Sequence, residues 1–141
     1  MFDSDEIAGR IKGVLVQALN VDEGEVTSAS RLQADLGAES IDMLDIVFRL
    51  EREFGLRIPR TELFPESVFQ GDPAFVQGGR VTDAGMTELR VAMPYAELGE
   101  FNLDRRVIVV PDLFTVDLIA RYITWKLRKN ATRAMGAQTQ T

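Results

Sequence analysis

Cysteine and histidine are both absent from the 141 residues of this chain. Without cysteine there can be no disulfide, no thiolate nucleophile and no cysteine-ligated zinc, and the lack of histidine removes most transition-metal sites as well. A nucleophilic serine normally needs a neighbouring base, for which histidine is the usual choice. The sequence therefore predicts no metal site and no catalytic residue, and we do not expect an enzyme.

Positive charge and long hydrophobic runs are also scarce. The chain has 16 Lys and Arg against 22 Asp and Glu, a net charge of -6, which disfavours nucleic acid and suits basic protein surfaces. No run approaches the roughly 18–20 apolar residues of a membrane span, and the acidic start of the chain is unlike a signal peptide. We therefore expect a cytoplasmic protein with no membrane span and no nucleic-acid partner.

Helical periodicity is the main pattern that is present. It predicts a first helix from Asp3 or Ser4 to about Asn20, a second from Ser40 to about Phe54, and a last one that begins at Thr115. The expected fold class is all-α, and residues 132–141 are expected to form a flexible tail. The predicted core consists of Ile7, Ile11, Leu15, Leu36, Val47, Leu50, Phe54, Val116, Ile119 and Ile123.

The segment 64–112 has a different character, because it holds four of the five prolines. A short helical turn over 60–64 is expected to precede it. Apolar residues alternate over 87–93, which favours a strand, and the β-branched run 106–110 could pair with it in a small β-hairpin. The segment is also rich in apolar and aromatic side chains, so part of it should pack against the helices. These side chains are Phe64, Phe69, Phe75, Met86, Leu89, Val91, Met93, Tyr95, Leu98 and Phe101.

Ser40 is the residue of most interest, because it follows a glycine turn at Gly37 and opens the second helix. The amide groups and the dipole at the start of a helix favour an anion. A phosphodiester formed on this hydroxyl would be well placed there. The other interpretation is that Ser40 is only the N-cap of the helix, a role that serine often has. The local pattern leaves both open.

The run from Asp35 to Asp42, Asp-Leu-Gly-Ala-Glu-Ser-Ile-Asp, resembles the carrier-site motif of the acyl carrier protein family. The likeness continues through Leu44-Asp45-Ile46-Val47 and Glu53-Phe54-Gly55, and it resumes at Phe114-Thr115-Val116-Asp117. The sequence departs from the family at Glu39, where Asp is usual, and in the insertion 64–112. The resemblance implies a four-helix bundle in one carrier domain, 1–131, with that irregular insertion before the last helix. It also implies a 4′-phosphopantetheine arm on Ser40.

By this resemblance the terminal thiol of the arm would hold an acyl chain as a thioester, which explains thiol chemistry in a chain without cysteine. The implied partners are a phosphopantetheinyl transferase and enzymes of fatty-acid or polyketide synthesis, such as a ketosynthase. Two alternatives remain open. One is a peptidyl or aminoacyl carrier, although Ala38 stands where those carriers usually have a second glycine. The other is an interaction module that keeps the fold without the arm.

The second helix is acidic, with six carboxylates and two arginines over 35–53, a net charge of -4. Carboxylates around exposed apolar side chains suit a transient protein interface, whereas the alternative is a simple solvated face. The residues expected to dock partners are Glu39, Ile41, Asp42, Leu44, Asp45 and Phe48. Cations in the last helix and tail are expected to stabilise its C-terminal end. They are Arg121, Lys126, Arg128, Lys129 and Arg133.

The insertion 64–112 falls beside the cleft in which the family shelters its acyl chain. Two roles are expected for it. Either it reshapes the acyl pocket or adds a docking surface, or it is an excursion with a small core of its own.

Overall fold

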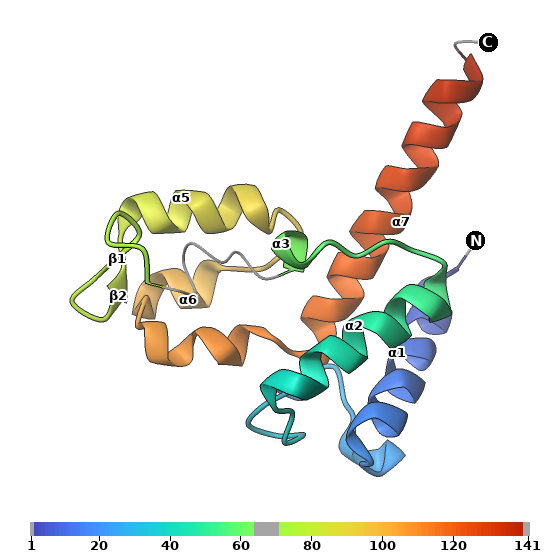
Figure 1. The fold of residues 1–141 in the computed structure, drawn as a ribbon, viewed down its shortest axis with the longest axis horizontal. Helices are drawn as coiled ribbons and strands as arrows, with labels where there is room; N and C mark the ends of the chain where they lie inside the picture. The colour runs from blue at the N-terminus through green and yellow to red at the C-terminus, as the bar shows by residue number, and fades with distance from the viewer. Residues whose placement is uncertain (1, 64–70, 140–141) are drawn as a thin grey trace.

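The chain folds into a helical bundle with a lobe on one side (Figure 1). The computed structural model describes residues 2–63 and 71–139, with the side chains at 60, 61 and 133–139 outside that description. The elements are α1 (Ser4–Leu19), η1 (Glu23–Glu25), α2 (Ser40–Phe54), α3 (Arg60–Leu63), β1 (Val76–Gln77), β2 (Arg80–Val81), α5 (Asp83–Ala92), α6 (Gly99–Asp104), η2 (Val107–Leu113) and α7 (Val116–Thr139). The all-α bundle with an inserted segment is thus confirmed.

The bundle consists of α1, α2 and α7, with α1 packed against both of the others. Local sequence fixes the helix ends. The Asp3 carboxylate accepts the Glu6 amide at 2.8 Å and so begins α1, and Asn20 ends it in the left-handed conformation. Gly55 ends α2 in the same way, with φ of 62°. All ten residues of the predicted core are buried, which confirms that part of the prediction.

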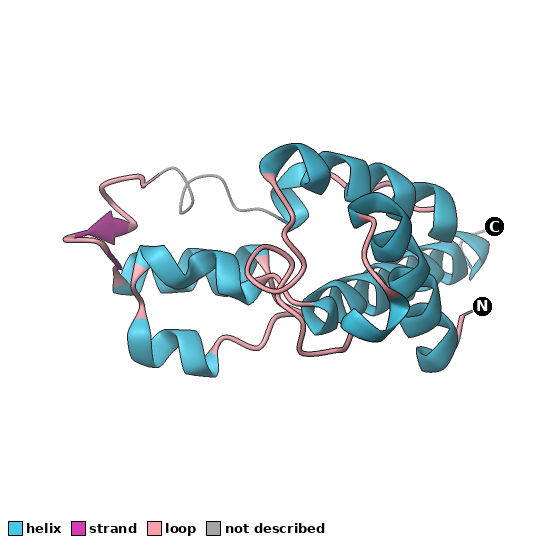
Figure 2. Ribbon diagram, turned by 90° about the horizontal axis from the view of Figure 1, so that it is seen from below, coloured by secondary structure: helices cyan, strands magenta, loops and turns pink. Residues whose placement is uncertain are grey.

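The lobe is built from the inserted segment and contains α5, α6, η2 and the two short strands (Figure 2). Strands β1 and β2 pair antiparallel, with Val76 opposite Val81 and Gln77 opposite Arg80. This end of the molecule lies far from both termini, which are on the bundle side in Figures 1 and 2. The insertion is therefore a structured unit over the residues that are described.

The predicted hairpin between 87–93 and 106–110 is wrong. The first segment lies mostly in helix α5, and most of the second is in the 3-10 helix η2. Met86, Leu89 and Met93 are fully buried on one helical face, whereas Val91 is 74% exposed. Over so few residues, an alternating apolar pattern cannot be distinguished from the apolar stripe of a helix. The residue that caps the segment favours the helix. The Thr82 hydroxyl accepts the Gly85 amide at 3.1 Å and starts a helix there.

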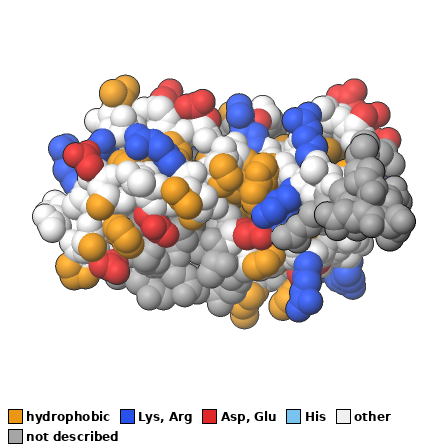
Figure 3. All heavy atoms as spheres, turned by 90° about the horizontal axis from the view of Figure 1, so that it is seen from above, with side chains coloured by type: hydrophobic (Ala, Val, Ile, Leu, Met, Phe, Trp, Pro, Cys, Tyr) orange, Lys and Arg blue, Asp and Glu red, His pale blue; other side chains and the backbone are white. Residues whose placement is uncertain are grey.

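Tyr95 joins the lobe to the bundle. Its ring lies 5.1 Å from that of Tyr122 and 5.5 Å from that of Trp125, both on α7. Hydrophobic side chains gather on the surface between α5 and α7, with Lys and Arg beside them (Figure 3). The expectation that part of the insertion packs against the helices is confirmed. Phe64 and Phe69 lie outside the described residues.

Helix α7 begins with a cap from Thr115, whose hydroxyl accepts the Leu118 amide at 3.1 Å. It continues to Thr139, and the flexibility of 132–141 stays a prediction. Lys126, one of the cations expected to stabilise the C-terminal end of this helix, is instead only 8% exposed. Across the described part of the chain, no helix is long and apolar enough to cross a membrane.

Candidate functional site

The loop before Ser40 is tied to the start of α7 by backbone hydrogen bonds. The amides of Val116 and Asp117 donate to the carbonyls of Ser30 and Ser28, at 3.0 and 2.9 Å, and Leu32 donates to Phe114 at 2.9 Å. The Leu32 side chain is fully buried. The segment that leads to Ser40 is therefore held in place by a helix about eighty residues further along the sequence.

The turn itself is fixed by a left-handed glycine between two buried side chains. Gly37 has φ of 73°, a conformation that favours glycine, while Leu36 and Ala38 are buried on either side of it. The Ala38 amide donates to the Leu32 carbonyl at 2.8 Å. The chain thus turns sharply at Gly37 and continues into the first turn of α2.

An ion pair braces the same turn. The Asp35 carboxylate accepts the Arg31 amide at 2.8 Å and the Arg31 guanidinium at 3.2 Å. The hydrogen bond from the Arg31 side chain lowers the pKa of Asp35 below its usual range, which favours the charged carboxylate of this ion pair.

Glu39, not Ser40, is the N-cap of α2. The Glu39 carbonyl accepts the Met43 amide at 3.1 Å, and the Glu39 amide donates to the Asp42 carboxylate at 2.8 Å. Ser40 is therefore the first residue of the helix, and the interpretation of Ser40 as an N-cap is wrong. Its side chain is exposed and has no hydrogen-bond partner among the residues that the structure describes. The hydroxyl is therefore accessible to a modifying group.

This position suits a phosphodiester. The first amides of a helix lack partners within it and point toward its N-terminal end, where the dipole is positive. Helix α2 has 15 residues, enough for a developed dipole. Because Ser40 is exposed, an arm attached to it would extend into solvent and need not disturb the core.

The predicted docking residues lie along α2 next to Ser40. Ile41, Leu44 and Phe48 are 74, 41 and 58% exposed, and their spacing places them on one side of the helix. Two of the predicted carboxylates also have local partners. Asp42 accepts the Glu39 amide, and Asp45 pairs with Arg49 at 3.0 Å. The apolar trio is therefore the part of this face without a structural role of its own.

A buried polar cluster was not predicted from the sequence. The Glu62 carboxylate accepts the Tyr122 hydroxyl and the Lys126 ammonium, each at 2.8 Å. The Tyr95 hydroxyl donates to the Glu62 carbonyl, also at 2.8 Å. Burial alone would raise the pKa of Glu62, but the hydrogen bonds from Lys126 and Tyr122 outweigh it and lower that pKa. Burial raises the pKa of Tyr95 and of Tyr122.

The cluster joins α3, α7 and the lobe at one point, although Glu62 and Lys126 are 64 residues apart in the chain. The one signal in the sequence is the spacing of Tyr122 and Lys126, which places both on one face of a helix. Within the described ranges, no group of three or more acidic side chains is placed to hold a metal.

Comparison with known proteins agrees with this geometry. A family model described as a phosphopantetheine attachment site matches residues 9–67, which include α2 and Ser40. The chain is also similar to the acyl carrier protein of Thermotoga maritima, at 38% identity over 63 residues. That match covers 45% of this chain and 78% of the relative. The family model covers the first part of the bundle, and the lobe lies outside it.

Proposed function

This chain belongs to the acyl carrier protein family, and we propose that it carries 4′-phosphopantetheine on Ser40 and an acyl chain as a thioester on that arm. A carrier of this family is not an enzyme. It holds the reacting group while other proteins act on it. The arm supplies the thiol that the cysteine-free chain lacks.

The observation that carries the assignment to Ser40 is its free, exposed hydroxyl at the start of α2 within the matched region. Ser30, by contrast, uses its hydroxyl in the fold by donating to the Glu25 carbonyl at 3.0 Å. Because Glu39 already caps the helix, the fold has no need of the Ser40 hydroxyl.

The direct test is the intact mass of the chain after incubation with coenzyme A and a phosphopantetheinyl transferase. We expect a gain of one phosphopantetheine group. With octanoyl-coenzyme A as donor, the chain should gain the acylated arm, and a ketosynthase should then remove the octanoyl group. No mass gain with several transferases would support the unmodified module, and loading by amino-acid-activating enzymes alone would support the peptidyl carrier.

We propose that partners dock on the α2 face formed by Glu39, Ile41, Asp42, Leu44, Asp45 and Phe48. The proposed partners are the transferase and enzymes of fatty-acid or polyketide synthesis. Carboxylates steer a basic partner toward this face. The exposed apolar side chains would be covered in the complex and supply the centre of the interface.

Phe48→Ser should weaken docking while leaving the fold intact. Phe48 is 58% exposed, so its loss should change the free energy of unfolding by about 0.5 kcal/mol at most. An aromatic side chain at an interface centre commonly contributes more than about 1 kcal/mol. We therefore expect modification of Ser40 to slow by about fivefold or more at limiting transferase, measured by intact mass against time.

Leu103→Ser is the matched control, because Leu103 lies on α6 of the lobe and is 87% exposed. This variant removes a large exposed apolar side chain away from the proposed docking face. It should be modified at the rate of the unaltered chain. Equal rates for both variants would contradict docking through Phe48.

A further inference from the structure

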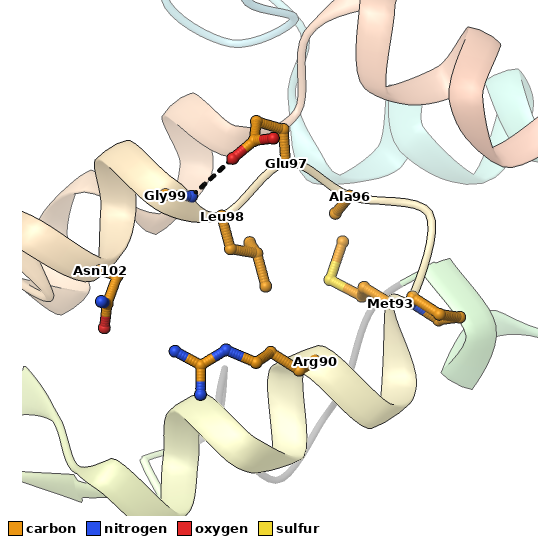
Figure 4. Close-up of a pocket in the computed structure, with 8 residues that line it drawn as sticks. Arg90, Met93, Ala96, Glu97, Leu98, Gly99 and Asn102 are labelled. Carbon is orange, nitrogen blue, oxygen red and sulfur yellow. Dashed lines mark hydrogen bonds between the residues drawn. The ribbon is translucent and has the colours of Figure 1, made fainter.

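A hollow of about 270 Å³ lies in the lobe, where the C-terminal half of α5 faces the start of α6 (Figure 4). Met93 is fully buried at its base, and Leu98 is 7% exposed. Pro94 and Ala96 also line it. The floor of the hollow is therefore apolar.

Polar groups are found at its rim. The Arg90 guanidinium extends from α5 toward α6, on the side where Asn102 lies (Figure 4). Arg90 has no hydrogen bond or ion pair with any described residue, whereas the nearby Arg105 pairs with Asp83. The Asn102 carbonyl oxygen accepts from Arg105 at 2.7 Å, and no described residue accepts from its amide nitrogen.

The one carboxylate at the hollow is turned away from Arg90. Glu97 lies on the opposite side, and its Oε1 accepts the Gly99 amide at 2.9 Å (Figure 4). The Arg90 guanidinium forms no described hydrogen bond or ion pair, although its charge acts on Asp83, and it is separated from Glu97 across an apolar floor. Such a convergence of one charged group and a few polar groups on apolar walls is typical of a small-molecule site.

We propose that this hollow binds a small amphipathic carboxylate, with the head group on Arg90 and the apolar tail against Met93 and Leu98. A guanidinium fits a carboxylate through two parallel hydrogen bonds. The free amide of Asn102 adds a donor on the same side. A volume of about 270 Å³ leaves room for several water-sized groups, which suits an alkyl tail of about six to eight carbons.

Binding at this hollow does not require the arm on Ser40. The hollow is formed entirely by residues of the lobe, which lies outside the matched carrier region of 9–67. The Ser40→Ala variant should therefore bind the carboxylate as the unaltered chain does. A failure of the carrier function would appear in the intact mass, whereas a failure of this site would appear in the binding of the carboxylate, so the two can be distinguished.

The test is calorimetric titration of the full chain with straight-chain carboxylates from butanoate to decanoate. We expect octanoate to bind with a dissociation constant of about 0.1 to 1 mM. Affinity should rise by up to about fourfold per added CH₂ and level off once the hollow is filled. Octanol, which has the same tail without the charge, should bind at least about tenfold more weakly.

Arg90→Ala should weaken octanoate binding by about tenfold or more, because a charge-assisted hydrogen bond is lost. Arg57→Ala is the matched control. Arg57 is an exposed arginine after α2 with no ion pair among the described residues, so its loss changes the net charge equally. Ala96→Leu is a second variant, which fills the hollow and should also weaken binding while Arg90 stays in place.

Three results would overturn the proposal. The first is that the unaltered chain does not bind octanoate at concentrations up to 10-fold above the expected dissociation constant. The second is that octanol binds as tightly as octanoate, and the third is that Arg90→Ala and Arg57→Ala have equal effects. Thermal unfolding of each variant shows that it is folded. Arg90 is exposed, so its removal should not affect the core.

Discussion

Ser40→Ala is expected to abolish phosphopantetheine attachment completely while leaving the fold unchanged. The hydroxyl is the acceptor of the phosphodiester, and alanine has no atom to replace it. The substitution removes no hydrogen bond that the structure describes, because Glu39 and Asp42 form the cap of α2. The free energy of unfolding should therefore change by no more than about 0.5 kcal/mol. Intact mass after incubation with coenzyme A and transferase measures the loss.

Ser28→Ala provides the control for this result. Ser28 is another exposed serine in the loop before α2, and only its backbone carbonyl takes part in a described hydrogen bond. Its variant should be modified as fully as the unaltered chain. Attachment that persists in Ser40→Ala, or that is lost in Ser28→Ala, would refute the assignment of the site.

Lys126→Met should destabilise the protein more than any surface substitution. The variant leaves the Glu62 carboxylate with the Tyr122 hydroxyl as its one described hydrogen-bond donor and with the more distant charge of Lys129. The Lys126 and Glu62 side chains are 10 and 23% exposed. Breaking a fully buried pair costs about 3–5 kcal/mol, and the partial exposure of Glu62 reduces the expected loss to about 2–3 kcal/mol. Urea unfolding at neutral pH measures this loss.

Arg121→Met is the matched control on the same helix. Arg121 pairs with Asp117 at 2.8 Å, but both side chains are about half exposed. Exposed pairs contribute about 0–1 kcal/mol, so this variant should remain close to the unaltered chain. Similar losses for both variants would contradict a special role of the buried cluster.

The same cluster should make stability depend on pH. The folded protein lowers the pKa of Glu62 below its ordinary value of 4.5. A carboxyl group with a lowered pKa in the folded state contributes fully above its unfolded value and loses that contribution as the pH falls through the folded value. The stability gap between the unaltered chain and Glu62→Gln should thus be present at neutral pH, begin to narrow below about pH 4.5, and shrink further as the pH falls through the lower folded pKa. A gap that stays constant into acid would contradict this.

The sequence alone determined the bundle and the place of Ser40, because local interactions decide both. Helical spacing selects the buried faces of α1, α2 and α7, and all ten predicted core residues are buried. Caps at Asp3 and Gly55 act over three or four residues and are visible in the sequence. The left-handed turn at Gly37 is likewise a local preference.

The tertiary structure decided what depends on residues far apart or on competition between neighbours. Ser40 and Glu39 compete for the cap of α2, and the Asp42 carboxylate favours Glu39 by accepting its amide. The pattern of residues 87–93 is compatible with a strand or a helix. The helix forms because Thr82 caps α5 and because Met86 and Met93 are buried on one side of it. Only the tertiary fold places Glu62 next to Lys126 and Arg90 at the hollow between α5 and α6. Contacts of this kind produce no repeating pattern in the sequence from which they could be predicted.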